Sequence, residues 1–329
     1  MSKVKWGVLS TAQIAQTELI PAFHRSNNAQ VYAIASLSGK AEKVAKQFGI
    51  PKAYNSYEKL LEDPQIEAVY IPLPNHLHKE WVIKAAQYGK HILCEKPAAL
   101  NVSDMEEMKK ACEENNVLIM EAFMYFFHPQ HDRVKEIIKS GEIGDVKLVK
   151  SSFSFLLTDK EENIRMNHIK GGGVLYDLGC YGIHSIRNIL ENEPTSVHVH
   201  AKADDKYMVE TDTITLLEFP NGVTGLIDSS FSTALRNEYE VVGTKGRIIV
   251  PRAYRPDLYD GEGLVLVKTN EETREESIVE DQYKAQVEHI SQAIRKGNII
   301  ISSPKNSLQN VRVIEACLQS IKNNGKVLL

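Results

Sequence analysis

The chain has 329 residues, more than one hydrophobic core usually spans, so two domains are expected. Its 43% hydrophobic residues, 25% charged residues and formal net charge of −4 are typical of a soluble protein and unsuited to nucleic acid. We find no signal-peptide pattern and no apolar stretch of about 18 residues, so we expect no membrane partner and a cytoplasmic location. Widely spaced cysteines favour reduced thiols and no metal site: Cys94, Cys112, Cys180 and Cys317.

Up to Phe123 the sequence alternates between strand and helix patterns, which predicts a doubly wound parallel sheet of the Rossmann type over residues 1–123. Apolar runs predict strands at residues 4–10, 31–36, 68–73, 91–95 and 117–123. Amphipathic patterns predict helices at Ala15–His24, Ala41–Phe48, His76–Tyr88 and Asp104–Asn115, the last with Asn101 or Ser103 as its N-cap.

After Phe123 a helix is predicted at Gln130–Ser140, and strand patterns then follow one another. Consecutive strands favour a large, mostly antiparallel sheet, so we predict an α+β domain over residues 124–329. A C-terminal helix is free to pack back on the first domain. Helices on one sheet face leave the other open, which predicts a homodimer or a dimer of dimers. The predicted strands are residues 146–155, 195–203, 212–220, 223–232, 238–243, 246–251 and 263–268, and the later helices are Val174–Leu190, Tyr283–Lys296 and Leu308–Asn323.

The turn after the first strand has the position of a dinucleotide-binding Gly-x-Gly-x-x-Gly/Ala motif. Ser10 and Ala12 occupy the first two glycine places, and both are small enough to let a pyrophosphate approach the following helix N-terminus. An ordinary strand-to-helix turn is the alternative. The candidate pyrophosphate-binding residues are Ser10, Thr11, Ala12, Gln13 and Ile14.

Three later motifs stand at strand ends and before a helix: PNHLH at residues 74–78, EKP at 95–97 and GGGVLYDLGCY at 171–181. In this order and with these separations, they resemble the Gfo/Idh/MocA oxidoreductase family over residues 3 to about 325. Within it, MEAF at 120–123 and NIR at 163–165 look most like the branch of dihydrodiol dehydrogenase and NADP-dependent xylose dehydrogenase.

The resemblance implies that the fourth strand ends at the nicotinamide crevice, with Lys96 pointing into the substrate site. Pro97 would fix the turn, as a cis or a trans peptide. Glu95 would anchor the loop or lie beside the coenzyme, and Pro74, Asn75 and His78 are further candidate coenzyme contacts. Without the resemblance, a lysine at a strand end is usually just solvated.

The glycines of residues 171–173 are expected to form a flexible entry to the helix that carries Asp177, Tyr181 and His184. Spacings of i, i+4 and i+7 place these three side chains on one helix face. We expect Tyr181 to accept the substrate's hydroxyl proton while the Lys96 ammonium lowers its pKa and steadies the developing alkoxide. Asp177 would orient the substrate or Lys96. His184 is a reserve acid or base, with a satisfied helix histidine as the alternative.

The resemblance places Asn163 and Arg165 beside the substrate, where the arginine would bind hydroxyls or brace the nicotinamide loop; a solvated loop arginine is the alternative. Tyr125 is a further candidate substrate contact. Phe126 stands where relatives commonly carry an arginine, which makes this wall of the pocket more aromatic.

The end of the second strand bears on the choice of coenzyme. NAD-specific folds place an acid there, but this strand ends in ASLSGK. Ser36, Ser38 and Lys40 are candidate ligands of a 2′-phosphate, so NADP is preferred over NAD, although Leu37 offers nothing to a phosphate. Ser38 could instead cap the next helix.

Together these features predict an NAD(P)-dependent dehydrogenase of a small polyol: an aldose, an inositol or a trans-dihydrodiol. A sensor that binds a sugar without catalysis is one alternative, and the Lys96–Tyr181 pair argues against it. A dehydrogenase of nucleotide-linked sugars is the other, and it would need a diphosphate pocket that the sequence does not reveal.

Overall fold

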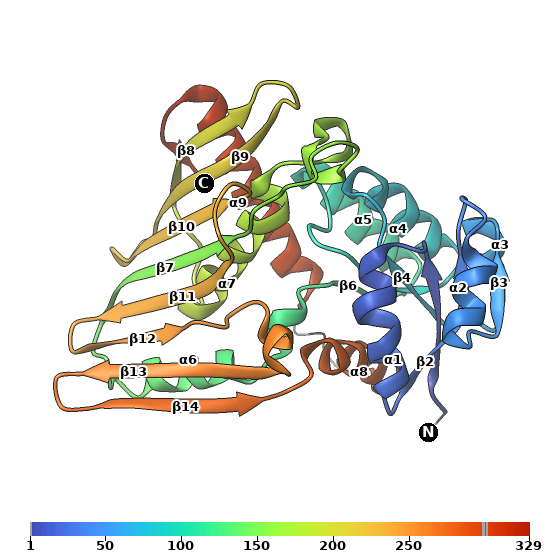
Figure 1. Cartoon of the computed structure of the whole chain (residues 1–329), viewed down its shortest axis with the longest axis horizontal. Helices are drawn as coiled ribbons and strands as arrows, with labels where there is room; N and C mark the ends of the chain where they lie inside the picture. The colour runs from blue at the N-terminus through green and yellow to red at the C-terminus, as the bar shows by residue number, and fades with distance from the viewer. Residues whose placement is uncertain (1, 298–299, 301) are drawn as a thin grey trace. The chain divides into compact units, whose positions relative to one another are not determined.

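A computed structural model describes residues 2–297, 300 and 302–329. The chain forms two compact units (Figure 1). Unit 1 contains the residues up to Phe123 and the segment Tyr283–Leu308, and unit 2 contains Met124–Gln282 and Gln309–Leu329. In the part of the chain that the structure describes, no helix is long and apolar enough to cross a membrane.

Unit 1 is built on a six-stranded parallel sheet with the order β3-β2-β1-β4-β5-β6, which is the order of dinucleotide-binding folds. This confirms the predicted Rossmann sheet. All five predicted strands are present, and β3 is an additional short edge strand. The strands are β1 (Val4–Leu9), β2 (Ala29–Ala35), β3 (Lys52–Tyr54), β4 (Ala68–Ile71), β5 (His91–Cys94) and β6 (Ile119–Glu121).

The crossover helices of unit 1 begin at side-chain caps where the sequence offers them. Ser56 accepts a hydrogen bond from the Lys59 amide, and Asn101, rather than Ser103, accepts one from the Asp104 amide. The π-helix η1 continues directly into α1. The helices are η1 (Ala15–Leu19), α1 (Ile20–Arg25), α2 (Ala41–Phe48), α3 (Tyr57–Leu61), η2 (Asn75–Leu77), α4 (His78–Gln87), α5 (Val102–Glu114) and α8 (Gln282–Lys296).

Helix α8 belongs to unit 1 although it follows most of unit 2 in sequence. The Trp6 indole N–H on β1 donates to the Ser291 hydroxyl at 3.1 Å, and Trp6 is fully buried. The Arg295 guanidinium also pairs with the Glu67 carboxylate. These contacts join the N-terminal strand to a segment near the C-terminus.

Unit 2 contains a nine-stranded sheet with the order β14-β13-β12-β11-β7-β10-β9-β8-β15. Its neighbours are antiparallel except for the parallel pair β7 and β10, which confirms the predicted mostly antiparallel sheet. The strands are β7 (Val146–Ser154), β8 (Ser196–Asp204), β9 (Val209–Glu218), β10 (Thr224–Ser230), β11 (Arg236–Gly243), β12 (Gly246–Val250), β13 (Glu262–Thr269), β14 (Thr273–Val279) and β15 (Val327–Leu328).

Helices of unit 2 cover one face of this sheet, and a continuous segment made of η6 and α7 lies directly on it (Figure 1). A Cβ on Gly182 would lie 2.5 Å from Ile227 of β10, so the helix needs a glycine at this contact. On the opposite face Ile214 and Leu216 are exposed. The helical elements are η3 (Met124–Phe127), α6 (Gln130–Lys139), η4 (Ile164–Met166), η5 (His168–Lys170), η6 (Leu175–Gly179), α7 (Cys180–Leu190), η7 (Pro256–Tyr259) and α9 (Pro304–Asn323), which begins in unit 1.

Candidate active site

The loop that carries Lys96 leaves the carboxyl end of β5 and is held by side chains from three other elements of unit 1. The Tyr70 hydroxyl on β4 donates to the Glu95 carboxylate at 2.6 Å. The Glu121 carboxylate at the end of β6 accepts the Ala98 amide at 2.8 Å. The Lys96–Pro97 peptide is cis, one of the two predicted forms. Glu95 therefore anchors the loop, and the backbone on both sides of Lys96 is fixed.

The third contact to this loop comes from His78, for which we predicted a coenzyme contact. Its ring is fully buried, with Nδ1 2.9 Å from the Pro97 carbonyl and Nε2 2.8 Å from the Leu73 carbonyl. Burial lowers the pKa of this histidine. The ring joins the segments that contain Leu73 and Pro97. We therefore infer that His78 holds these two backbone segments in position. Pro74 and Asn75, at the carboxyl end of β4, are partly exposed.

The turn after β1 has the backbone of a glycine motif although it contains no glycine. Ser10 has φ = 141°, in the region that favours glycine, and its hydroxyl accepts the Ala12 amide at 3.0 Å. Thr11 and Ile14 are partly exposed, and Gln13 is exposed. Small side chains and a glycine-like turn before a helix fit the pyrophosphate of an NAD(P) dinucleotide.

The three candidate phosphate ligands after β2 differ in exposure. Ser36 is buried, and its hydroxyl lies 3.3 Å from the Thr11 hydroxyl and 2.9 Å from the Ser38 hydroxyl. Ser38 and Lys40 are exposed, as is Leu37. The N-cap residue of helix α2 is Lys40 and makes no side-chain cap bond, so Ser38 does not cap this helix. Ser36 thus braces the first turn, while Ser38 and Lys40 are the residues open to a phosphate.

In unit 2, the glycines before the helix allow close packing rather than the flexibility that we predicted. The Gly173 amide donates to the Arg165 carbonyl, and the Gly172 amide to the Asn167 carbonyl, both at 2.8 Å. A Cβ on Gly172 would lie 2.6 Å from the Arg165 carbonyl oxygen. The entry to η6 is therefore bound tightly to the segment that contains Arg165.

Arg165 and Asp177, two of the predicted site residues, form an ion pair. The Arg165 Nε lies 2.6 Å from the Asp177 carboxylate, which raises the pKa of the guanidinium. The Arg165 guanidinium also lies 5.6 Å from the centre of the Phe155 ring. The pair fixes both side chains next to the first turn of the helix.

Tyr181 lies one turn further along and is buried in an aromatic cluster. Its ring centre is 5.2 Å from that of Phe153, 5.5 Å from that of Tyr254 and 5.7 Å from that of Tyr125. Its hydroxyl donates to the Met124 sulfur at 3.4 Å. Ring packing on several sides therefore fixes the orientation of Tyr181.

Tyr125 and His184 support this cluster from inside the core. The Tyr125 hydroxyl and the His184 Nδ1 are 2.5 Å apart, and both residues are buried. Burial holds the pKa of His184 well below its ordinary value, so the ring is neutral. His184 thus has a structural contact through Nδ1, and its role as a reserve acid or base stays a prediction. The Phe126 ring packs against the His184 ring. The Lys135 ammonium lies over the Phe126 ring, 5.3 Å from its centre.

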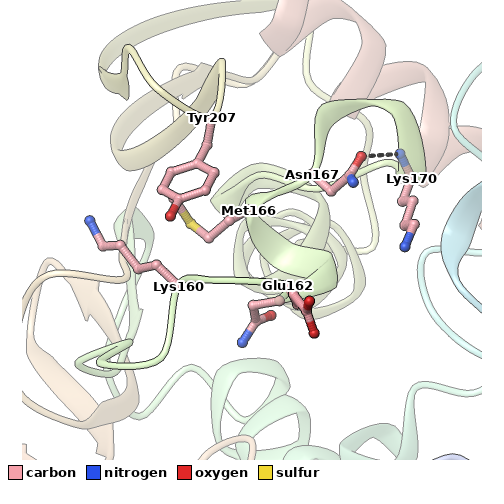
Figure 2. A pocket seen from close by; sticks show the side chains of 7 residues that line it. Lys160, Glu162, Met166, Asn167, Lys170 and Tyr207 are labelled. Carbon is pink, nitrogen blue, oxygen red and sulfur yellow. Dashed lines mark hydrogen bonds between the residues drawn. The ribbon is translucent and has the colours of Figure 1, made fainter.

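Asn163 lines a hollow of about 470 Å³ on unit 2 (Figure 2). Its amide oxygen accepts the Arg165 amide at 3.1 Å, and its amide nitrogen donates to the Asp159 carbonyl at 3.0 Å. Asn163 therefore shapes its own turn. The other lining residues are Lys160, Glu162, Met166, Asn167, Lys170 and Tyr207.

The structure thus gathers Asp177 with Arg165, and Tyr181 with Tyr125 and His184, inside unit 2, while Lys96 belongs to unit 1. The pairing of Lys96 with Tyr181 remains a prediction. Sequence reasoning missed the contacts that Tyr70, Glu121 and Tyr254 make with the candidate site residues or their loop. Their contacts join distant parts of the chain, and even the motif MEAF, which contains Glu121, does not show which amide this carboxylate accepts.

Residues 4–123 match the family model of an oxidoreductase family with an NAD-binding Rossmann fold, and residues 131–249 match the GFO/IDH/MocA C-terminal domain. The chain belongs to the GFO/IDH/MocA oxidoreductase family. This confirms the resemblance seen in the sequence, and the chain is an oxidoreductase with an NAD-binding fold.

Two relatives and one solved structure place the chain within the family. It is 36% identical to D-xylose 1-dehydrogenase (NADP(+)) 2 of Haloferax volcanii, covering 98% of this chain and 99% of the relative. It is 33% identical to trans-1,2-dihydrobenzene-1,2-diol dehydrogenase of Xenopus laevis over 75% of each chain. A 3-ketoreductase of Actinomadura kijaniata, solved with NADP and TDP-benzene, matches with a TM-score of 0.92 and 28% identity, covering 97% of this chain and 98% of that one.

Proposed function

We propose that this oxidoreductase is an NADP-preferring dehydrogenase of small polyols, with an aldose as the first substrate to test. The observation that carries the proposal is the similarity over nearly the whole chain to an enzyme named as an NADP-dependent xylose dehydrogenase. The similarity to a trans-dihydrodiol dehydrogenase supports the wider class of vicinal hydroxyls.

In the proposed reaction, the bound coenzyme accepts or supplies the hydride, and this chain supplies proton transfer and orientation. The Tyr181 hydroxyl exchanges a proton with the substrate hydroxyl whose carbon exchanges the hydride. The Lys96 ammonium stabilises the negative charge that develops on that oxygen. The Arg165–Asp177 pair of unit 2 binds further hydroxyls, which suits a substrate with several of them.

The coenzyme would lie with its pyrophosphate at residues Ser10–Ile14 and its adenosine phosphate at Ser38 and Lys40. The absence of an acid at the end of β2 and the exposure of Ser38 and Lys40 support NADP over NAD. We expect kcat/KM on one substrate to favour NADP, and Leu37→Asp to move the preference toward NAD by repelling the phosphate. A wild-type preference for NAD of tenfold or more, about 1.4 kcal/mol, would refute this assignment.

The functional test is a coenzyme-reduction screen with aldoses, inositols and trans-dihydrodiols, each with NADP and with NAD. Turnover of one class supports the proposal and names the substrate class. Binding of a sugar without turnover of any compound would instead support a regulatory protein.

A second candidate, the reduction of nucleotide-linked sugars, is favoured by the similarity to the 3-ketoreductase solved with TDP-benzene. Thymidine diphosphate sugars therefore join the screen, with NADPH oxidation as the signal. Turnover of these compounds alone would replace the first proposal by the second.

We also propose that the protein is a cytoplasmic homodimer or a dimer of dimers formed through the open face of the unit 2 sheet. Leu216 of β9 pairs in register with Leu226 of β10 on that face, and Ile214 beside them is 53% exposed. Four cysteines without a disulfide support a reducing compartment. Leu216→Glu should dissociate the dimer, and a monomeric mass of the wild type by light scattering at micromolar concentration would end the idea.

A further inference from the structure

Glu210, the second residue of β9, holds the start of the helix from which Asp177 and Tyr181 project. Its Oε1 accepts the Leu175 amide at 3.0 Å. The carboxylate lies flat against Gly173, where an added Cβ would be 2.3 Å from Oε1 and 2.7 Å from Oε2. A residue of the sheet thus takes the space that a side chain at position 173 would need.

The contact matters because the first amides of a helix have no partner within the helix. The Asp177 amide already donates to the Gly173 carbonyl at 3.2 Å, so the helix starts immediately before Leu175. The Leu175 amide points out of that first turn and is taken by Glu210. The sheet and the entry loop therefore hold the first turn from two sides.

We propose that Glu210 is a positioning residue for Asp177 and Tyr181, and that turnover depends on its bond to the Leu175 amide. The inference rests on the proposed function, since turnover is its main measurement. Without this bond the first turn is free to shift, and the Asp177–Arg165 pair shifts with it. Coenzyme affinity should change little, because the candidate coenzyme residues belong to unit 1.

Several charged groups near Glu210 have contacts of their own. Asp177 on the helix is paired with Arg165. On β8, Ala203 lies opposite Glu210, and its neighbour Asp204 pairs with Lys160 at 3.2 Å. Further along the same strands, Lys202 lies opposite Asp212, which accepts the Ser230 hydroxyl.

Burial raises the pKa of Glu210 to about 7, because the low-dielectric surroundings disfavour its charged form. Both protonation states retain an oxygen that can accept the Leu175 amide. A glutamine at this position should therefore preserve the contact.

The test compares purified Glu210→Ala, Glu210→Gln and Glu210→Asp with wild type on the best substrate of the screen. We expect Glu210→Ala to lower kcat by about tenfold or more while the coenzyme KM stays within about twofold. Glu210→Gln should stay within about threefold of wild type, because its carbonyl still accepts the amide. Glu210→Asp should resemble Glu210→Ala, because its carboxylate is one methylene too short. Glu218→Ala, in the same strand but bonded to Ser196 and Lys326, is the matched control and should leave kcat unchanged.

Hydrogen exchange of the Leu175 amide is a second measurement that needs no substrate. Protection should fall in Glu210→Ala and persist in Glu210→Gln, so it tests the bond even if the proposed polyol activity is absent from the wild type. An unchanged kcat in Glu210→Ala, or equal loss in the glutamine variant, would overturn the inference. If the alanine variant does not fold, the comparison of glutamine with aspartate decides, and an active aspartate with an inactive glutamine overturns it.

Discussion

Lys96 and Tyr181 are held in position by different kinds of interaction. The Lys96 loop is fixed by hydrogen bonds between its residues and the side chains of Tyr70, His78 and Glu121, the last of which accepts the Ala98 amide. Tyr181 projects from a helix and is fixed by aromatic rings. A loop leaves backbone groups without regular partners, so buried side chains must satisfy them. A helix satisfies its own backbone, so its side chains depend on packing and on how the helix starts.

The largest expected effect comes from removing the two reactive groups themselves. Lys96→Ala and Tyr181→Phe should each lower kcat by roughly 10²–10⁴ while coenzyme binding, measured by fluorescence titration, stays nearly intact. Near-normal turnover in either variant would show that this residue does not have its assigned role. The interactions that hold that residue in position would then not matter for turnover.

Because Glu210 contacts the start of the helix that carries Tyr181, the free energy of unfolding should depend on pH through this residue. Its pKa is raised from 4.5 to about 7 in the folded protein, so the stability that its neutral form provides is present below pH 4.5 and is lost as pH rises through 7. The free energy of unfolding of wild type should therefore fall, relative to Glu210→Gln, by up to about 3 kcal/mol between pH 5 and 9. Urea unfolding of both proteins at the two pH values measures this, and a constant difference between them would contradict it.

A matched pair of tyrosine substitutions separates polar support from packing. Tyr70→Phe removes the bond to Glu95 and should lower stability by about 1–2 kcal/mol and kcat by roughly tenfold, because the Lys96 loop loosens. Tyr254→Phe removes the bonds to Ser151 and Ser185 but keeps the ring beside Tyr181. Its kcat should stay within about threefold of wild type. Equal losses of kcat in both variants would show that the Lys96 loop and Tyr181 do not differ in their dependence on hydrogen bonds.

The smallest effect is expected at the turn after β1. Ser10→Gly relieves the positive φ, whereas Ser10→Ala keeps it, and both lose the hydroxyl bond to the Ala12 amide. The glycine variant should be more stable than the alanine variant by about 1 kcal/mol in thermal unfolding. Equal stability would show that the turn after β1 stores no backbone strain.

The sequence predicted those parts of the fold that have a periodic apolar pattern. The buried parallel strands and the alternating antiparallel strands were found within a few residues. Three edge strands were missed. β3 reads KAY and β14 reads TREESIV, and their residues are mostly polar or exposed, while β15 has only the two residues Val327 and Leu328. Helix α8 was predicted at Tyr283–Lys296, but its contact with β1 was not, since Trp6 and Ser291 meet only through the fold.

For the candidate site, the sequence named residues more reliably than their contacts. Arg165 and Asp177 were both chosen, but their ion pair was not foreseen. His78 was chosen as a coenzyme contact, but its buried ring lies between two backbone carbonyls. The sequence around a histidine does not distinguish these two situations. Glu210 lies at the start of a strand with no neighbouring motif, and only the three-dimensional packing brings it to the helix.

The discontinuous chain of unit 1 bears on how a ribosome delivers this protein. The chain passes from one unit to the other after Phe123, after Gln282 and after Leu308. After Trp6, 285 further residues must therefore be synthesised before the chain contains Ser291, whose hydroxyl accepts the hydrogen bond of the indole. The nascent nucleotide-binding domain stays incomplete until strands β7 to β14 of the second sheet have been made. Chaperones that bind unfinished domains would thus be needed longest by the segment up to Phe123, although this segment is made first.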